Sequence, residues 1–437
     1  MNNKIGICCA ISCGLFIFSG RADAITLAEC KALSLRNSKL LASYEDAIKA
    51  SLYAHRKDTS ALLPQLSAFY GSEFLQFSHR SEFTHGSQDR IGLALSYDLQ
   101  KLLVNYPRLS HLELEKNRLV KAVAEQEVQK DLTQEYYKLF VLLEKQQEYA
   151  GARSFIAEHI KDIERLRARG MEVRLDLMRA KVQLTSLYMS ISNVNGEIEN
   201  ALIALNSMMG TTYTAPDFAS MDATDMAALK SDQAVFEENT PEVSGEDSYL
   251  ERVETQVPQN IPSLEQSGLN AFDVKIAKAS YQRSQWYFVP SLQVWFEHNL
   301  HTVDPNVEAY KTSVVLNFDV FDLAQKATEE RQLKYSYESH KKLFEENQRK
   351  LTVRIEQLIT EIENVKTTYK YAIDNVASAE KSLDTAKEYF QQGKIKETDL
   401  LSVFSDYLNT KDQSYEMLYS FLSKKAELDA LIKGMEG

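Results

Sequence analysis

Histidines and carboxylates are the side chains of this sequence that could act together in chemistry, and two groups of them lie in or beside predicted strand-connecting loops. Imidazole nitrogens and carboxylate oxygens are common ligands of zinc, so these groups raise the question of a metal site. Their spacing matches no known ligand motif, and surface loops are polar in any case. We therefore predict no metal at these residues, which are His79, His85, His298 and His301 with Glu82, Asp89, Asp304 and Glu308.

Motifs typical of enzymes are absent from the sequence. The 437 residues contain no phosphate-binding glycine loop, no nucleophile elbow, and no HExxH or paired-cysteine metal motif. The net charge of −12 disfavours nucleic acid as a partner, because phosphate recognition requires a basic surface. We predict a protein that is not an enzyme, uses no cofactor and binds no nucleic acid.

Two aspartates share a spacing that points to a common role. Asp176 follows Gly170 by six residues, and Asp399 follows Gly393 by six. Each glycine interrupts a helical pattern, so each aspartate falls at the start of a returning helix. A carboxylate at that place can cap the helix by accepting hydrogen bonds from its free N–H groups.

The same spacing extends over most of the chain. Pro64 precedes Gly170 by 106 residues, and Pro290 precedes Gly393 by 103. A further glycine ends the helical arm 40 residues later in the first case and 41 in the second, at Gly210 and Gly434. This agreement predicts an internal duplication. The predicted domains are a signal peptide (1–24), a first structural repeat (25–210), an acidic linker (211–265) and a second structural repeat (266–437).

Long helices are predicted in both repeats. Residues 351–390 carry apolar or small side chains at steps that alternate between four and three, which is the rhythm of a coiled coil. Neither glycine nor proline occurs in 323–392, so this helix would be roughly 100 Å long. A similar pattern predicts helices over 108–169 and 173–209. A capping box of Thr26 and Glu29 predicts another helix, from there to about residue 63.

Four short segments have the period of strands instead. Apolar residues alternate with small or polar ones in 91–99, 291–297 and 312–320, and less regularly in 65–77. Polar loops are predicted between them, over 78–90 and 298–308. About ten residues are enough for a tilted strand to cross a bilayer. Because open strand edges are unsatisfied in lipid, four strands would have to be completed by further copies of the chain; the alternative is a small soluble sheet.

The N-terminus has the pattern of an export signal. An apolar run over 5–18 is followed by small residues at Ala22 and Ala24, which predicts cleavage after Ala24. Only one of the four cysteines, Cys30, then remains. Lipid attachment to Cys30 is the alternative, but Glu29 directly before it does not fit that pattern. No later stretch is apolar enough for a membrane-spanning helix.

The junctions between helices and strands resemble those of the TolC family of outer-membrane channel proteins. The resemblance rests on 61–66 and 288–292 before the strands, on 95–99 and 316–322 after them, and on the residues around Gly170 and Gly393 at the helical hairpin tips. It implies a mainly α fold with a small β part. Long coiled-coil hairpins would form a periplasmic tunnel, and four strands per chain would build a trimeric 12-stranded barrel.

The resemblance also implies roles for residues near the tips. Asp176 and Asp399 match aspartates that ring the narrow tunnel entrance in this family, where carboxylates favour cations. Three positions depart from the residues that close the entrance in family members: Phe390, Ile395 and Ser402. Arg174 and Lys396 are nearby cations that could substitute.

The function implied is that of a passive exit duct in the cell outer membrane, for efflux or type I secretion. Its partners would be two further copies of the chain, outer-membrane lipid, a periplasmic adaptor protein and an inner-membrane pump. The alternative is a periplasmic coiled-coil adaptor or a secreted interaction rod without channel activity. An adaptor should carry lipoyl-type half-motifs beside its hairpin, and the sequence shows none.

Overall fold

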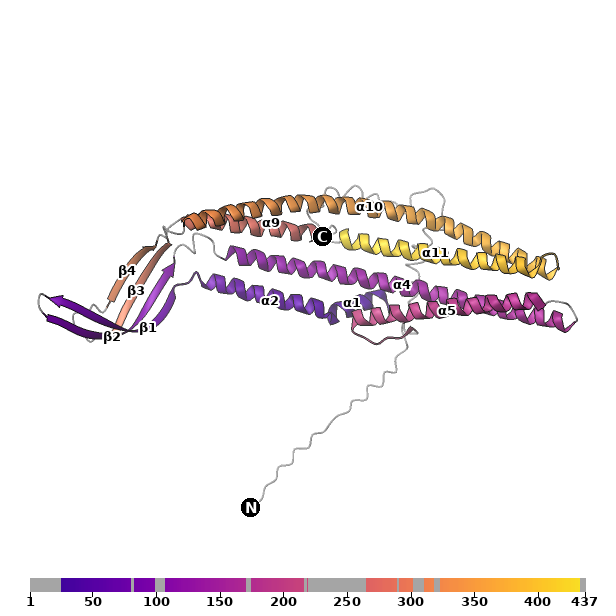
Figure 1. Cartoon of the computed structure of the whole chain (residues 1–437), viewed down its shortest axis with the longest axis horizontal. Coiled ribbons are helices and arrows are strands. Elements are labelled where there is room, and N and C mark those ends of the chain that lie inside the picture. The colour runs from indigo at the N-terminus through magenta and orange to yellow at the C-terminus, as the bar shows by residue number, and fades with distance from the viewer. Residues whose placement is uncertain are drawn as a thin grey trace, which may run out of the picture.

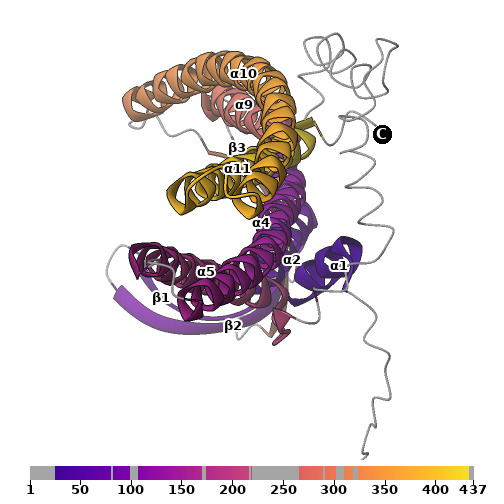
Figure 2. The ribbon, with the colours of Figure 1, turned by 90° about the vertical axis from the view of Figure 1, so that its right-hand side faces the viewer.

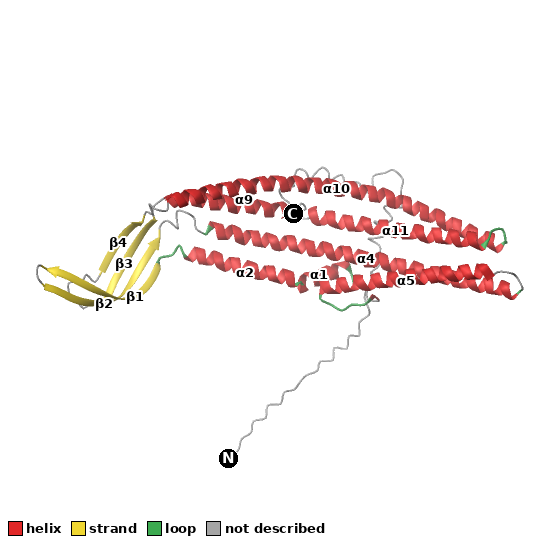
Figure 3. Cartoon of the chain, in the orientation of Figure 1, coloured by secondary structure: helices red, strands yellow, loops and turns green. Residues whose placement is uncertain are grey.

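A computed structural model describes residues 25–79, 82–98, 107–169, 174–215, 218, 265–288, 291–301, 310–317 and 323–432. The predicted signal peptide, most of the acidic linker, Gly170, Pro290 and Gly434 lie outside these residues. The chain is elongated, with a β-sheet at one end and helices along the rest (Figures 1 and 3). This arrangement confirms the predicted mainly α fold with a small β part.

Two long helices run nearly the whole length of the helical part (Figure 1). Helix α4 (Arg108–Ala168) has 61 residues and α10 (Leu323–Gln391) has 69, so they are roughly 90 Å and 100 Å long. Shorter helices pair with them: α2 (Lys39–Ser60) and α9 (Glu265–Ser284) near the sheet, α5 (Arg174–Met209) and α11 (Glu397–Ile432) farther away.

The helices form one layer, and the order of neighbours is the same along its length. Far from the sheet the order is α5, α4, α11, α10, and near the sheet it is α2, α4, α9, α10. Viewed end-on, this layer follows a curve (Figure 2). Helix α10 therefore forms one edge of the chain, while α2 and α5 form the other.

The sheet is an antiparallel meander of four strands in chain order. Its strands are β1 (Gln65–His79), β2 (Glu82–Asp98), β3 (Ser291–His301) and β4 (Tyr310–Asn317). The short helix η2 (Gln285–Phe288) leads into β3. Strands β1 and β4 form the two edges of the sheet, on the same sides as the edge helices.

The polar segments between the strands are shorter loops than predicted. Pairing of β1 with β2 continues to His79 and Glu82, so most of 78–90 is strand. Likewise, β3 continues to His301. The reason is that backbone hydrogen bonds hold an antiparallel hairpin together whether or not its side chains alternate.

The register of the strands places their apolar residues on one face. Leu66 pairs with Leu95, which pairs with Phe296, and directly paired residues share a face. Val294 and Val314 pair on the same side. These side chains are uncovered in the single chain, since Leu66 is 69% and Phe296 50% exposed.

The predicted first helix is broken, which corrects the expectation of one helix up to residue 63. Helix α1 (Leu27–Asn37) begins with the predicted capping box, and Ser38 then caps α2. The break lets Asn37 donate a hydrogen bond from Nδ2 to the carbonyl of Met209, at 2.6 Å. Helix α1 thereby packs on α4 and α5, and Cys30 is fully buried there.

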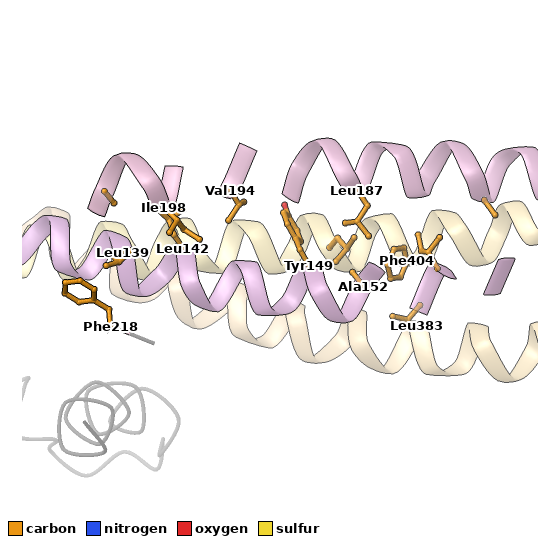
Figure 4. Packing of buried hydrophobic residues seen from close by; sticks show 14 of the residues in the cluster. Leu139, Leu142, Tyr149, Ala152, Leu187, Val194, Ile198, Phe218, Leu383 and Phe404 are labelled. Carbon is orange, nitrogen blue, oxygen red and sulfur yellow. The ribbon is translucent and has the colours of Figure 1, made fainter. Parts of the chain in front are cut away.

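The core is a long seam between helices. All predicted coiled-coil positions of 351–390 are buried or half-buried, so that prediction is confirmed. Figure 4 shows part of the larger cluster, in which side chains of α4 and α5 meet Leu383 and Phe404 of the second half. Phe218 packs against the same cluster.

Glycines cap the ends of α5 and α10, and the predicted interruption of the helical pattern at Gly393 is confirmed. Gly210 and Gly393 have φ angles of +66° and +69°, a region that favours glycine. After α10, Lys394 N–H donates to the carbonyl of Tyr389 at 2.8 Å, and Gly393 N–H donates to that of Phe390 at 2.9 Å. This is a Schellman motif, which ends the helix and turns the chain toward α11.

Candidate tunnel entrance at the helical tips

The end of the molecule farthest from the sheet holds the predicted site residues. Four helix ends meet there: those of α4 and α10 and the starts of α5 and α11 (Figure 1). Between them lies a cleft of about 870 Å³. Its lining is rich in charged side chains of both signs, together with Phe155, His159 and Phe390.

Asp399 acts locally as a cap of α11. Its Oδ2 accepts a hydrogen bond from the Lys396 N–H at 3.1 Å, and Thr398 Oγ1 donates to Oδ1 at 3.4 Å. The carboxylate nevertheless remains exposed. Its capping geometry is thus compatible with a second role toward a pore.

Asp176 occupies the matching position in the first turn of α5. It is half-buried, and Arg179 Nη1 lies 4.0 Å from its Oδ1. Asp176 lines the tip cleft, whereas Asp399 lines a different hollow between α10 and α11. The two aspartates are therefore not brought together within one chain.

The other predicted residues lie where the sequence placed them. Arg174 and Lys396 are exposed beside the starts of α5 and α11. Pro64 lies between α2 and β1, at the predicted helix-to-strand junction. Among the described residues, no group of three or more His, Cys, Asp or Glu side chains could hold a metal ion.

A buried ion pair at the tip was not predicted. His159 Nε2 of α4 lies 2.5 Å from Oε2 of Glu397, the first residue of α11. Their side chains are only 7% and 2% exposed. The two residues are 238 apart in sequence, so no spacing pattern could pair them. The available signal was a histidine within the apolar stretch of α4.

Aromatic rings surround this pair. Phe155 stacks on the His159 ring at 6.2 Å between centroids, and Phe390 meets it edge-on at 5.0 Å. Phe404 of α11 lies 4.9 Å from Phe155. Phe390, which departs from the TolC-family pattern by lacking a hydroxyl, thus packs against histidine. Ile395 is half-buried against the same core, and Ser402 is exposed.

A second polar contact joins α4 and α11 nearer the middle of the shaft. We call it the mid-shaft clasp. Tyr149 of α4 donates to Asp412 Oδ2 at 2.5 Å, and Tyr407 of α11 donates to Glu148 Oε1 at 2.6 Å. Each helix therefore offers one phenol to a carboxylate of the other.

Lysines complete the mid-shaft clasp in the same reciprocal way. Lys145 Nζ lies 3.2 Å from Asp412 Oδ1, and Lys411 Nζ lies 3.7 Å from Glu148 Oε2. The Asp412 Oδ1 atom receives no well-aligned hydrogen bond, so the contact with Lys145 is an ion pair only.

The phenols of the clasp are held in their neutral form. Burial, followed by the hydrogen bond to Asp412, raises the pKa of Tyr149 well above its usual range. Burial and the bond to Glu148 raise the pKa of Tyr407 in the same way. The pKa of Tyr415 is also raised, by burial and by the nearby charges of Glu148 and Glu144. All three hydroxyls stay protonated at neutral pH.

These features define a class of protein by its fold: a curved layer of long helices with a four-stranded sheet at one end. No helix among the described residues is both long and apolar enough to span a membrane. By sequence, no protein-family model and no curated protein matches the chain.

Solved structures match it over nearly its whole length. The CmeC outer membrane channel of Campylobacter jejuni is 15% identical, with a TM-score of 0.72 over 93% of this chain and 85% of that one. The outer membrane protein VceC of Vibrio cholerae is also 15% identical, with 0.74 over 94% and 96%. The MtrE outer membrane channel of Neisseria gonorrhoeae is 11% identical, with 0.73 over 93% and 89%. The chain thus has the fold of outer-membrane channels, and its TolC-like architecture is confirmed.

Proposed function

We propose that three copies of this chain form an exit duct in the cell outer membrane, with the helical part in the periplasm. The observation that carries this proposal is the position of the apolar side chains that remain exposed in the single chain. Large exposed apolar side chains of the described helices lie on the edges of the layer, while α4, α9 and α11, which lie inside it, carry none.

The two edges are suited to pack against each other between copies. On α5, four of the six large exposed apolar residues follow steps of three, four and seven, so they form one stripe along the helix: Leu175, Met178, Val182 and Met189. On the opposite edge, α10 exposes Tyr335, Leu343, Val353, Tyr371 and Tyr389. A curved layer with one apolar stripe at each edge closes into a ring when copies meet edge to edge.

The sheet supports the same assembly. Strands β1 and β4 have free edges, and unpaired backbone groups are costly in lipid. Three copies supply twelve strands, which is within the range of closed membrane barrels. The exposed apolar face of Leu66, Leu95, Phe296 and Leu316 would then contact outer-membrane lipid.

In such a trimer the helical tips would form the periplasmic entrance. Asp176 and Asp399 would supply its carboxylates, with Arg174 and Lys396 as neighbouring cations. A periplasmic adaptor and an inner-membrane pump would deliver cargo there, for efflux or type I secretion. We also propose that each chain consists of two structural repeats joined by an acidic linker over 211–265.

Cell fractionation and cross-linking test this proposal. Met178→Cys with Tyr389→Cys places one thiol on each edge near the tips, and oxidation should link copies into trimers in the outer-membrane fraction. Met178→Cys with Asp406→Cys is the matched control, since Asp406 lies on the inner helix α11. A soluble periplasmic monomer that forms no cross-links would overturn the proposal in favour of an adaptor or rod.

A further inference from the structure

Two histidines meet where α2 contacts α4, in the part of the helical layer that adjoins the sheet. His55 lies on α2 and His111 on α4, and their ring centroids are 5.4 Å apart, with the ring planes tilted by 46°. His111 is exposed and His55 is half-buried, so solvent reaches the pair. The proposed exit duct assigns no role to either residue.

A chain of hydrogen bonds fixes which nitrogen of His55 carries the proton in the neutral ring. The buried hydroxyl of Ser110 donates its only proton to the carbonyl of Pro107 at 3.1 Å. Toward His55 Nδ1, which lies 3.3 Å away, this hydroxyl can therefore only accept, so Nδ1 carries the proton. The Nε2 atom then keeps its lone pair. Histidines that bind metals typically have this arrangement, in which one nitrogen donates to a neighbouring oxygen and the other binds the ion.

The separation of the two rings matches that of two imidazoles bound to one metal ion. With metal–nitrogen distances of about 2.0–2.1 Å and a tetrahedral angle at the ion, the ring centroids lie roughly 5–5.5 Å apart. The observed 5.4 Å falls within this range. The tilt of 46° lies between those of a stacked and an edge-on pair of rings, so aromatic packing alone does not account for the contact.

Neighbouring contacts hold α2 and α4 in the register that brings the histidines together. One turn before His55, Ser51 accepts a hydrogen bond from Asn117 Nδ2 at 2.5 Å. Farther along the same pair of helices, Lys121 Nζ lies 2.8 Å from Glu45 Oε1. The two rings are therefore positioned by the helices before any ion binds. Such preorganisation favours binding, because little conformational freedom is lost when the ion arrives.

We propose that His55 and His111 form a binding site for a divalent transition-metal ion that prefers imidazole ligands: Cu²⁺, Ni²⁺ or Zn²⁺. Two ligands are fewer than the four of a structural zinc site, so water completes the coordination and the ion exchanges with solvent. Cu²⁺ binds most tightly of the three, in line with the general order of metal affinities. Mg²⁺ and Ca²⁺ do not bind, because they require oxygen ligands. The bound ion bridges α2 and α4 beside the sheet.

Equilibrium dialysis of the full-length protein against Ni²⁺ tests the site without using conduction, so the result is independent of the proposed channel function. The readout is the amount of Ni²⁺ bound per chain in the wild type and in variants, since other histidines of the chain can also bind this ion. His55→Gln and His111→Gln should each remove one bound ion per chain. The double variant should remove no more than either single variant, because both imidazoles belong to one site. Excess Mg²⁺ should not displace the ion.

Two further variants separate this site from independent histidines. Ser110→Ala keeps both imidazoles but removes the acceptor for His55 Nδ1, so it should weaken Ni²⁺ binding about tenfold, the usual effect of losing the hydrogen-bond partner of a metal-binding histidine. His340→Gln, at a half-buried histidine of α10, is the control and should bind as the wild type does. Wild-type amounts of bound Ni²⁺ in His55→Gln or His111→Gln would overturn the proposal. A double variant that loses twice as much as each single variant would also overturn it, because the two rings would then bind separately.

Discussion

The buried pair of His159 and Glu397 at the tip and the mid-shaft clasp join the same two helices with different chemistry. At the tip, one histidine and one carboxylate are almost completely buried. At mid-shaft, two phenols and two lysines serve two carboxylates that are about a quarter exposed. The clasp spreads its charge over several partly exposed groups, whereas the tip pair consists of two buried groups that rely on each other. Removing one partner should therefore cost more at the tip than at mid-shaft.

The largest expected effect comes from removing one partner of the buried tip pair. His159→Ala leaves Glu397 buried without a counter-charge, which should lower the free energy of local opening at the tip by about 3–5 kcal/mol. Hydrogen exchange at pH 6 measures this at 397–404, while 407–416 should change little. Glu388→Ala, at an exposed site on α10, is the control. An equal loss of opening free energy at 397–404 and 407–416 would contradict the conclusion that the tip and the mid-shaft are stabilised separately.

A smaller effect is expected from the mid-shaft clasp. Tyr149→Phe removes the donor to Asp412 and should lower the opening free energy of 407–416 by about 1.5–3 kcal/mol, the usual value of a hydrogen bond to a charged group. Tyr407→Phe should act alike through Glu148. Tyr188→Phe, at an exposed position of α5, should have no effect on these peptides. If Tyr149→Phe and Tyr188→Phe changed the opening free energy of 407–416 equally, the clasp would not stabilise the mid-shaft.

The clasp should respond to pH only in the alkaline range. The pKa values of Tyr149, Tyr407 and Tyr415 are raised in the folded chain. Their stabilisation is therefore complete below the unfolded pKa of about 10 and is lost as the pH rises above it, by up to about 1.4 kcal/mol per phenol and pH unit. Mid-shaft exchange corrected for its intrinsic rate should be flat from pH 6 to 9 and should accelerate above 10. Acceleration below pH 9 would show that carboxylates or lysines dominate.

The turn between α10 and α11 offers a test that leaves both contacts intact. Gly393→Ala forces a Cβ into the left-handed region and should cost about 1–2 kcal/mol, although the space around it is open. Gly196→Ala, inside α5 with open space as well, should instead stabilise by about 0.5–1 kcal/mol. Thermal unfolding of the two variants measures these opposite shifts. Shifts of the same sign would show that the turn is not strained.

The smallest effect on stability is expected at Asp399. Asp399→Ala removes the acceptor for the Lys396 N–H and should cost about 0.5–1 kcal/mol at the start of α11. Asp399→Asn keeps an acceptor and loses the charge. In single-channel recordings both variants should reduce cation preference if the carboxylate lies at the entrance. An unchanged preference in both would leave Asp399 as a cap alone.

Much of the fold follows from local patterns, because helices and strands are set by the spacing of apolar residues along the chain. The seam of 351–390 and the interruption of the helical pattern at Gly393 were predicted and are confirmed. The break at Ser38 was missed, although serine is a common helix cap; the contact of Asn37 with Met209, 172 residues away, accompanies the break and is not visible in the sequence. The extra length of β1 and β2 was missed because backbone pairing leaves no signature in side-chain alternation.

The sequence by itself determined that this is a long-helix protein with two short pairs of strands, because periodicity and glycine and proline positions are properties of neighbouring residues. Only the tertiary structure decided which polar residues meet. His159 and Glu397 are ordinary charged residues until α4 and α11 pack side by side and bury them. Burial turns such a pair from a weak surface contact into one whose disruption is costly, and burial is set by the whole fold.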